Sequence, residues 1–165
     1  LPGAVRESDI LFIAVGTPQD EDGSADLTHV LDVARGIGQA MNGYKIVITK
    51  STVPVGTGQM VERAVREHSG GGQEFAVVSN PEFLREGSAI EDFLRPDRVV
   101  IGARTQRAID VMLDIYAPLK AAGVPFVVAV LMALSRVALG LHYPSDVAAG
   151  AAIGAATASL LLALF

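Results

Sequence analysis

Charged residues are distributed very unevenly along this chain of 165 residues. The chain has 13 lysines and arginines and 18 aspartates and glutamates, yet after Leu119 only Lys120, Arg136 and Asp146 are charged. A water-soluble domain carries charged side chains over most of its surface, whereas a long uncharged run is buried in a core or in a bilayer. The sequence therefore predicts a water-soluble domain over residues 1–119 and an apolar tail over residues 120–165.

The first part has the pattern of an α/β sheet. Short apolar runs alternate with segments of helical period, which favours a parallel sheet with crossover helices. The predicted strands are residues 10–15, 46–48, 75–78 and 99–101. The predicted helices are residues 27–41, 60–65 and 106–116. Asp26 is the expected N-cap of the first helix, because its side chain can accept a hydrogen bond from a free backbone N–H.

Three loops that directly follow predicted strands carry polar residues. In open α/β sheets ligands bind beyond the carboxyl ends of the strands. Residues 16–18 present a hydroxyl in a tight turn, and residues 51–58 present hydroxyls and glycines at a helix start, where free N–H groups favour anions. Residues 80–87 present Glu82 and Glu86, which would share a face on one helical turn. From spacing alone, ligand binding and simple capping of turns and helices both stay open.

The same loops resemble a known family. The motifs are VGTP (residues 15–18), STVPVGT (51–57), NPEFLREG (80–87) and PDRVVIG (96–102). In this order they are similar to the UDP-glucose 6-dehydrogenase family over residues 1–119. The resemblance implies a partial Rossmann-type NAD-binding domain from an enzyme that oxidises the C6 alcohol of UDP-glucose to the carboxylate while two NAD are reduced.

The resemblance also assigns roles to single residues. The catalytic residue that it implies, for acid/base work at the sugar carbon, is Glu82. The cofactor-binding residues that it implies are Thr17, Thr52 and Glu86. The residues that it places beside the nucleotide sugar are Phe83, Leu84 and Arg85.

Two parts of the family's pattern are missing from this sequence. No glycine-rich fingerprint precedes residue 10, and Gly36 and Gly38 lie in a predicted helix, where they indicate close packing. The family forms a thioester on a cysteine, and this chain has no cysteine, which also excludes thiolate metal sites; no metal site is predicted. We therefore interpret residues 1–119 as a fragment that does not turn over UDP-glucose alone. An incomplete sheet with an open strand edge further predicts oligomerisation.

The tail contains two apolar runs. Residues 124–134 are too short to span a bilayer unless the run continues through Ser135-Arg136 to Leu141. Residues 147–165 are uncharged over a length close to one membrane span. The same Ala- and Gly-rich composition packs soluble cores, so membrane insertion and soluble packing both stay open. The expectation is one or two apolar helices, with membrane contact through residues 124–165 and a cytoplasmic location for residues 1–119.

A polar motif separates the two apolar runs. It consists of Ser135-Arg136, His142 and Asp146, and it resembles the last of three motifs of the type 2 phosphatidic acid phosphatase family. The resemblance implies that His142 attacks a phosphoryl group, that Asp146 orients it and that Arg136 holds the phosphate. The family's earlier basic motif and its Pro-Ser-Gly-His motif are absent, so the tail is not expected to form a complete phosphatase site.

Three interpretations remain, and the first is favoured because its match is longer and more specific. The chain is a fragment of an NAD-dependent UDP-glucose 6-dehydrogenase, or a membrane-tethered nucleotide-binding remnant, or part of a membrane lipid or polyprenyl phosphate phosphatase that completes its site with another chain. The expected ligands are NAD and UDP-glucose or a related nucleotide sugar. No basic patch suggests nucleic acid as a partner.

Overall fold

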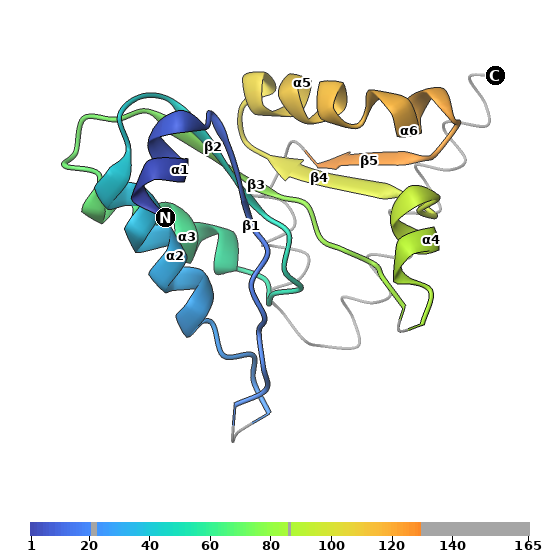
Figure 1. The fold of residues 1–165 in the computed structure, drawn as a ribbon, viewed down its shortest axis with the longest axis horizontal. Coiled ribbons are helices and arrows are strands. Elements are labelled where there is room, and N and C mark those ends of the chain that lie inside the picture. The colour runs from blue at the N-terminus through green and yellow to red at the C-terminus, as the bar shows by residue number, and fades with distance from the viewer. Residues whose placement is uncertain (21–22, 86, 130–165) are drawn as a thin grey trace, which may run out of the picture. The chain divides into compact units, whose positions relative to one another are not determined.

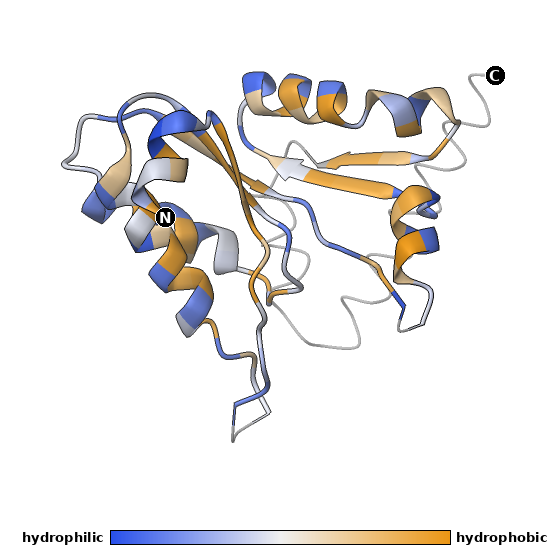
Figure 2. Ribbon diagram, in the orientation of Figure 1, coloured by the Kyte–Doolittle hydropathy of each residue, from blue (hydrophilic) through white to orange (hydrophobic). Residues whose placement is uncertain are grey.

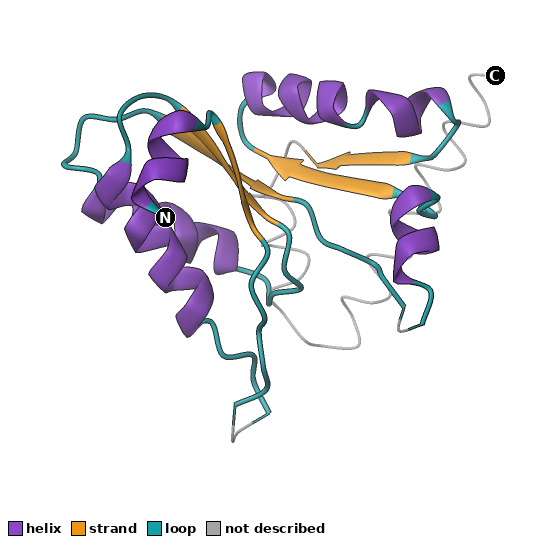
Figure 3. Ribbon diagram, viewed as in Figure 1, coloured by secondary structure: helices purple, strands orange, loops and turns teal. Residues whose placement is uncertain are grey.

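The computed structural model describes residues 1–20, 23–85 and 87–129. The chain divides into two compact units, Leu1–Val130 and Leu131–Phe165, and all described residues belong to the first. In them, helices pack around one five-stranded sheet (Figures 1 and 3). The prediction of an α/β fold is confirmed.

The sheet is mostly parallel. Its strands, in their order across the sheet, are β1 (Ile10–Ile13), β2 (Lys45–Thr49), β3 (Phe75–Ser79), β4 (Val99–Ala103) and β5 (Phe126–Ala129). Strands β1, β2 and β3 are parallel to one another, and β5 is parallel to β4. Strand β4 runs antiparallel to β3, with Ser79 opposite Gly102.

The prediction of a wholly parallel sheet is therefore wrong at β4. A parallel connection needs a crossover that packs on the sheet, usually a helix. The helix between β3 and β4, α4 (Ala89–Leu94), has no buried residue and does not act as such a crossover. The chain instead turns back, and the last residues of β3 pair with the last residues of β4, so the first residues of β4 extend past the end of β3.

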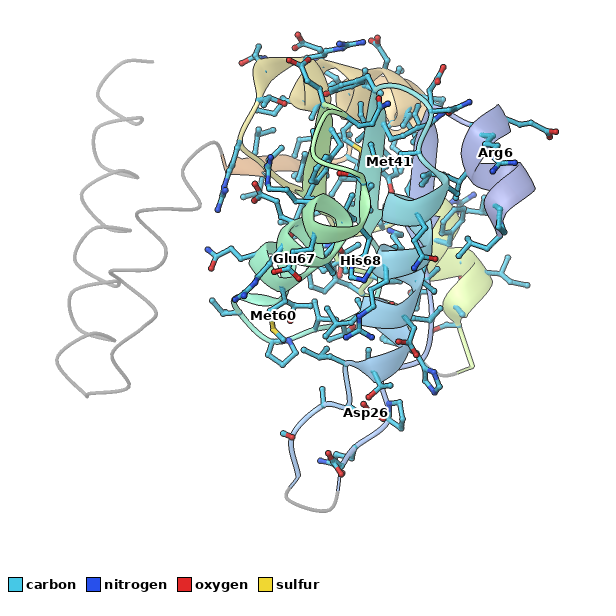
Figure 4. All side chains as sticks on the ribbon, turned by 90° about the vertical axis from the view of Figure 1, so that its left-hand side faces the viewer. Arg6, Asp26, Met41, Met60, Glu67 and His68 are labelled. Atoms are coloured by element: carbon cyan, nitrogen blue, oxygen red, sulfur yellow. The ribbon has the colours of Figure 1, made fainter. Side chains whose placement is uncertain are left out.

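Five further helices surround the sheet. They are α1 (Pro2–Glu7), α2 (Thr28–Ala40), α3 (Thr57–His68), α5 (Gln106–Ile115) and α6 (Ala117–Ala121). The helices predicted within residues 27–41, 60–65 and 106–116 are confirmed, with shifted ends. The N-cap position of α2 is Leu27, one residue after the predicted Asp26. Asp26 lies at the foot of α2 (Figure 4), and its carboxylate accepts the Thr28 N–H at 2.8 Å. Hydrogen bonding by Thr28 holds the pKa of Asp26 below its usual value.

Two apolar cores lie on opposite faces of the sheet. Successive side chains of a strand point to opposite faces, so Val47 packs with α2 and α3 while Ile46 and Ile48 pack with α5. All five residues of β2 are buried. The strands are mostly hydrophobic in colour in Figure 2. Burial on both faces is the reason that residues 46–48 of β2 form a continuous apolar run.

Helices α2 and α3 approach each other closely at Gly38. A Cβ atom placed there would lie 2.5 Å from the carbonyl oxygen of Val65 on α3. The packing role predicted for Gly38 is confirmed, because no side chain fits at this crossing. Gly36 differs, since a Cβ there would meet the far end of the Leu1 side chain and no backbone atom.

The start of the predicted apolar tail belongs to the sheet. Helix α6 ends at Ala121, and residues 126–129 form β5, with Phe126 opposite Val99. The prediction of apolar helix is wrong for these residues, whose aromatic and β-branched side chains favour a strand. The predicted span over residues 147–165 lies outside the described residues. Among the helices that the structure describes, none combines the length and hydrophobicity needed to cross a bilayer.

Candidate active site at the carboxyl edge of the sheet

Three loops leave the sheet at one edge, because β1, β2 and β3 are parallel. The backbone N–H of Lys50 donates to the carbonyl of Ile13 at 2.9 Å, and that of Asn80 donates to the carbonyl of Thr49 at 3.0 Å. The ladder thus continues by one residue past β2 and β3. Polar side chains in the three loops are brought together on this firmly paired backbone.

The first two loops are joined by their hydroxyl groups. The Thr17 hydroxyl donates to the carbonyl of Thr52 at 3.1 Å, and the Ser51 hydroxyl donates to the carbonyl of Val15 at 2.7 Å. The Thr52 side chain itself is exposed. The two predicted cofactor-binding threonines are therefore in contact, on a rigid polar surface beside the start of α3.

The third loop is anchored by Asn80. This side chain is buried, at 1% exposure, and its amide donates to the carbonyl of Val100 at 2.8 Å. Its carbonyl oxygen accepts the hydroxyl of Tyr116, which follows α5. A buried amide with both ends satisfied holds the chain in one place. Asn80 thereby sets the position from which residues 81–85 begin.

Glu82 is held by a lysine from the second loop. The Lys50 ammonium lies 3.1 Å from the Glu82 carboxylate and 3.4 Å from the Tyr116 hydroxyl. The Lys50 and Glu82 side chains are 16% and 26% exposed, so the pair is partly shielded from solvent yet reachable. A carboxylate fixed in this way can accept a proton or a hydrogen bond from a bound hydroxyl group.

A cleft of about 360 Å³ opens beside this pair. One wall is the loop over residues 80–85, another is α4 with the residues before β4, and Tyr116 and Leu119 close the remaining side. Charged and aromatic side chains both line it, which suits a ligand with polar groups and flat or apolar faces.

The predicted substrate-binding residues lie on the wall of the cleft. The side chains of Phe83 and Leu84 are largely exposed, Phe83 at 51%. Arg85 instead points to α4, where its guanidinium donates to both carboxylate oxygens of Asp92, at 2.6 and 3.1 Å. The backbone N–H of Arg85 donates to Asp92 as well, at 2.8 Å. The side-chain and then the backbone hydrogen bonds from Arg85 hold the pKa of Asp92 far below its usual range.

The third loop is not helical over its described residues 80–85. The prediction that Glu82 lies on a helical turn, where it would share a face with Glu86, is therefore wrong for Glu82. Glu86 lies outside the described residues, as do the phosphatase-like residues Arg136, His142 and Asp146. Within the described ranges, no group of three or more potential ligands could hold a metal ion.

Sequence reasoning missed three residues of the site, Lys50, Tyr116 and Asp92. Lys50 could have been predicted from the sequence, because it directly follows a strand whose carboxyl end faces the site. Tyr116 and Asp92 could not have been predicted, since the contacts of Tyr116 with Asn80 and of Asp92 with Arg85 form only in the folded structure.

Comparisons with known proteins identify the family to which the first part of the chain is similar. The model of the UDP-glucose/GDP-mannose dehydrogenase family, NAD binding domain, matches residues 1–120, and that of the PAP2 superfamily matches residues 98–165. UDP-glucose 6-dehydrogenase TuaD of Bacillus subtilis is 50% identical over 121 residues, and that of Rhizobium meliloti is 56% identical over 122 residues. The matches cover 73% and 72% of this chain but 26% and 28% of those relatives.

Solved structures show the same fold. A UDP-glucose dehydrogenase from Pyrobaculum islandicum is 52% identical, with a TM-score of 0.71 over 78% of this chain and 30% of that one. A GDP-mannose dehydrogenase from Pseudomonas aeruginosa is 32% identical, with a TM-score of 0.73 over 92% of this chain and 35% of that one. The matched family domain implies NAD as the cofactor. The chain belongs to the UDP-glucose/GDP-mannose dehydrogenase family, of which it contains NAD-binding domain sequence.

Proposed function

We propose that residues 1–119 bind NAD and UDP-glucose as a fragment of an NAD-dependent UDP-glucose 6-dehydrogenase, and that the chain alone does not complete the reaction. The observation that carries this proposal is the Lys50–Glu82 pair, 3.1 Å apart beside a cleft and at the same sheet edge as the Thr17 and Thr52 loops. A fixed carboxylate beside a polar cofactor surface is what oxidation of an alcohol requires.

In this proposal the cofactor binds to the Thr17 and Thr52 loops, and the nucleotide sugar binds in the cleft beside Glu82. Thr17 and Thr52 hold the cofactor, for which their linked loops offer a rigid polar surface. Glu86 assists them, a role that rests on its motif alone. NAD, when bound, would supply the hydride acceptor. Glu82 takes the proton of the C6 hydroxyl, and Lys50 keeps its carboxylate aimed into the cleft.

The nucleotide sugar lies in the cleft, against residues 83–85. Phe83 and Leu84 offer exposed apolar surface to its flat and apolar parts. Arg85 borders the ligand without binding it through its guanidinium, because that group is already engaged by Asp92 at both oxygens. Arg85 therefore acts by holding the loop to α4.

The absence of cysteine limits the chemistry of this chain. Oxidation of an alcohol to a carboxylate passes through an aldehyde, and the family carries the second oxidation on a cysteine thioester. This chain has no cysteine to form that intermediate. Ligand binding without turnover is therefore the expected behaviour.

Calorimetry with NAD and UDP-glucose tests the proposal. We expect both ligands to bind, and we expect Thr52→Ala to weaken NAD binding by about tenfold, the effect of losing about one useful hydrogen bond. Ser69→Ala is the matched control, because Ser69 lies at the far end of α3 and donates to Arg66. Steady growth of absorbance at 340 nm with NAD and UDP-glucose would show turnover and refute the inactive fragment.

A second candidate is favoured by the PAP2 match at residues 98–165. In it, the chain is a membrane-tethered nucleotide-binding remnant, or one part of a membrane lipid or polyprenyl phosphate phosphatase that uses Arg136, His142 and Asp146. Co-sedimentation with lipid vesicles tests the tether. Release of phosphate from a lipid phosphate, lost in His142→Ala and kept in Thr52→Ala, would favour the phosphatase over the dehydrogenase fragment.

A further inference from the structure

The cleft is lined by equal numbers of basic and acidic side chains. The basic ones are Lys50, Arg85, Arg95 and Arg98, and the acidic ones are Glu82, Glu91, Asp92 and Asp97. Lys50 is paired with Glu82, and Arg85 is paired with Asp92. These two cations are therefore not available to a ligand without breaking an existing ion pair.

Two further acids and two further cations line the cleft. Asp97 acts electrostatically on Arg85, whose pKa is raised first by its hydrogen bond to Asp92 and, in smaller part, by Asp97. Arg95 lies past the end of α4, and among the described residues neither Arg95 nor Arg98 forms an ion pair. Of these two cations, Arg98 is the one that is stacked on an aromatic ring.

Arg98 is held by an aromatic ring instead of a carboxylate. Its guanidinium lies over the ring of Phe83, 5.0 Å from the centroid. Among the described residues, no carboxylate forms an ion pair with it. A guanidinium stacked on a ring keeps its N–H groups at the rim free, in the planar fork that binds phosphate oxygens in pairs.

The antiparallel turn of β4 places this arginine at the site. Arg98 directly precedes β4, and the first residues of β4 extend past the end of β3, because the last residues of the two strands pair with each other. Phe83 comes from the loop that carries Glu82. The stacked pair therefore joins two walls of the same cleft, which Glu82, the carboxylate proposed to act on the sugar, also lines.

We propose that Arg98, held on Phe83, is the anion-recognition residue of the cleft and binds the diphosphate group of the nucleotide sugar. The assignment rests on the proposed function for the identity of the ligand, and on the local geometry for the residue. Because the acidic and basic side chains of the cleft balance, removal of Arg98 leaves it with a net negative charge, which repels a diphosphate.

Calorimetry on the full chain, at constant ionic strength, tests this role with three ligands: inorganic diphosphate, UDP-glucose and NAD. We expect Arg98→Ala to weaken diphosphate and UDP-glucose by about tenfold or more, the loss of a charge-assisted bidentate contact. Arg98→Lys keeps the charge without the fork and should retain part of the affinity. Phe83→Leu keeps apolar bulk without the ring and should cost about threefold. NAD affinity should not change, because its proposed surface is the Thr17 and Thr52 loops.

Arg107→Ala is the matched control. Arg107 also stacks on a ring, that of Tyr44 at 3.8 Å, but it does not line the cleft. Its variant should bind all three ligands like the wild type. Equal thermal midpoints for the Arg98 and Arg107 variants establish that both are folded.

The outcomes of these titrations separate the role of Arg98 from the proposed function. UDP-glucose binding that is equal in the wild type and in Arg98→Ala overturns the role of Arg98 and leaves the proposed function intact. Diphosphate binding lost in Arg98→Ala, without binding of UDP-glucose to the wild type, supports Arg98 and overturns the proposed substrate. A wild-type chain that binds neither diphosphate nor UDP-glucose overturns both.

Discussion

The body of the sheet and the wall of the cleft are stabilised in different ways. All five residues of β2 are buried between two apolar cores, whereas α4 buries none of its residues. Ile90, Phe93 and Leu94 of α4 are instead exposed. The hydrophobic colour on this helix in Figure 2 marks apolar residues. Polar contacts, above all those of Arg85 with Asp92, hold the wall.

This difference teaches where the molecule can change shape. A core strand opens only when the whole domain unfolds, whereas a segment without buried apolar contacts opens locally at low cost. Ligand-binding segments are usually drawn from the second kind. The cleft wall, to which we assign ligand binding, is thus expected to be the less stable part of the described domain, and substitutions can test that contrast.

The largest contrast compares two isoleucines. Ile48 in β2 is 0% exposed and Ile90 in α4 is 79% exposed. We expect Ile48→Ala to lower the free energy of unfolding by about 2–5 kcal/mol, because it leaves a cavity in the core. Ile90→Ala should change it by less than about 0.5 kcal/mol. Denaturant unfolding followed by circular dichroism measures both, and equal losses would contradict the contrast.

The second contrast compares two glycines of α2, the helix that packs on the sheet. A Cβ at Gly38 would meet the Val65 backbone oxygen, which cannot move away, so Gly38→Ala should destabilise by about 1–3 kcal/mol. A Cβ at Gly36 meets the end of the Leu1 side chain, which can rotate. Gly36→Ala should therefore be neutral or stabilise by up to about 1 kcal/mol, the gain in helix propensity. Comparable losses in the two variants would argue against a tight crossing at Gly38.

The sequence predicts the body of the sheet well and its edge poorly. The run Ile46-Val47-Ile48 can be recognised because burial on both faces demands apolar residues at every position. The direction of β4 cannot, since Val99, Val100 and Ile101 would read the same in either direction. Strand β5 was hidden because its apolar residues continue into an apolar tail, and composition does not separate a strand from a helix there.

The site shows the same limit. Glu82, Thr17 and Thr52 follow from motifs that lie within single loops. Tyr116 could not be predicted, because it is 66 residues from Lys50 and 36 residues from Asn80 in the chain. Only the completed sheet, with α5 packed on it, brings these side chains together.

The third contrast concerns this polar junction. Tyr116→Phe removes the hydroxyl that donates to the buried Asn80, which leaves the Asn80 oxygen without its donor. We expect a loss of about 1 kcal/mol in the free energy of unfolding. Tyr44→Phe is the control, because the Arg107 guanidinium stacks on the ring of Tyr44 and a phenylalanine keeps that ring. An equal loss in the control would mean that the Tyr116 hydroxyl does not stabilise the junction.

The smallest effect is expected on the cleft wall, from Asp92→Asn. Hydrogen bonds from Arg85 lower the pKa of Asp92 from its ordinary value of 3.8, so the ionised form is favoured in the folded state. The stabilisation is then fully present above about pH 4 and is lost as the pH falls through the lower folded pKa. Hydrogen exchange of the Arg85 amide, which donates to Asp92, reports the contact directly. The variant should exchange faster than wild type at neutral pH, and the difference should shrink in acid, whereas Asp114→Asn on α5 should match the wild type throughout. A difference that stays constant down to acid pH would mean that the ionised carboxylate does not hold the wall, and that the wall depends on packing like the body of the sheet.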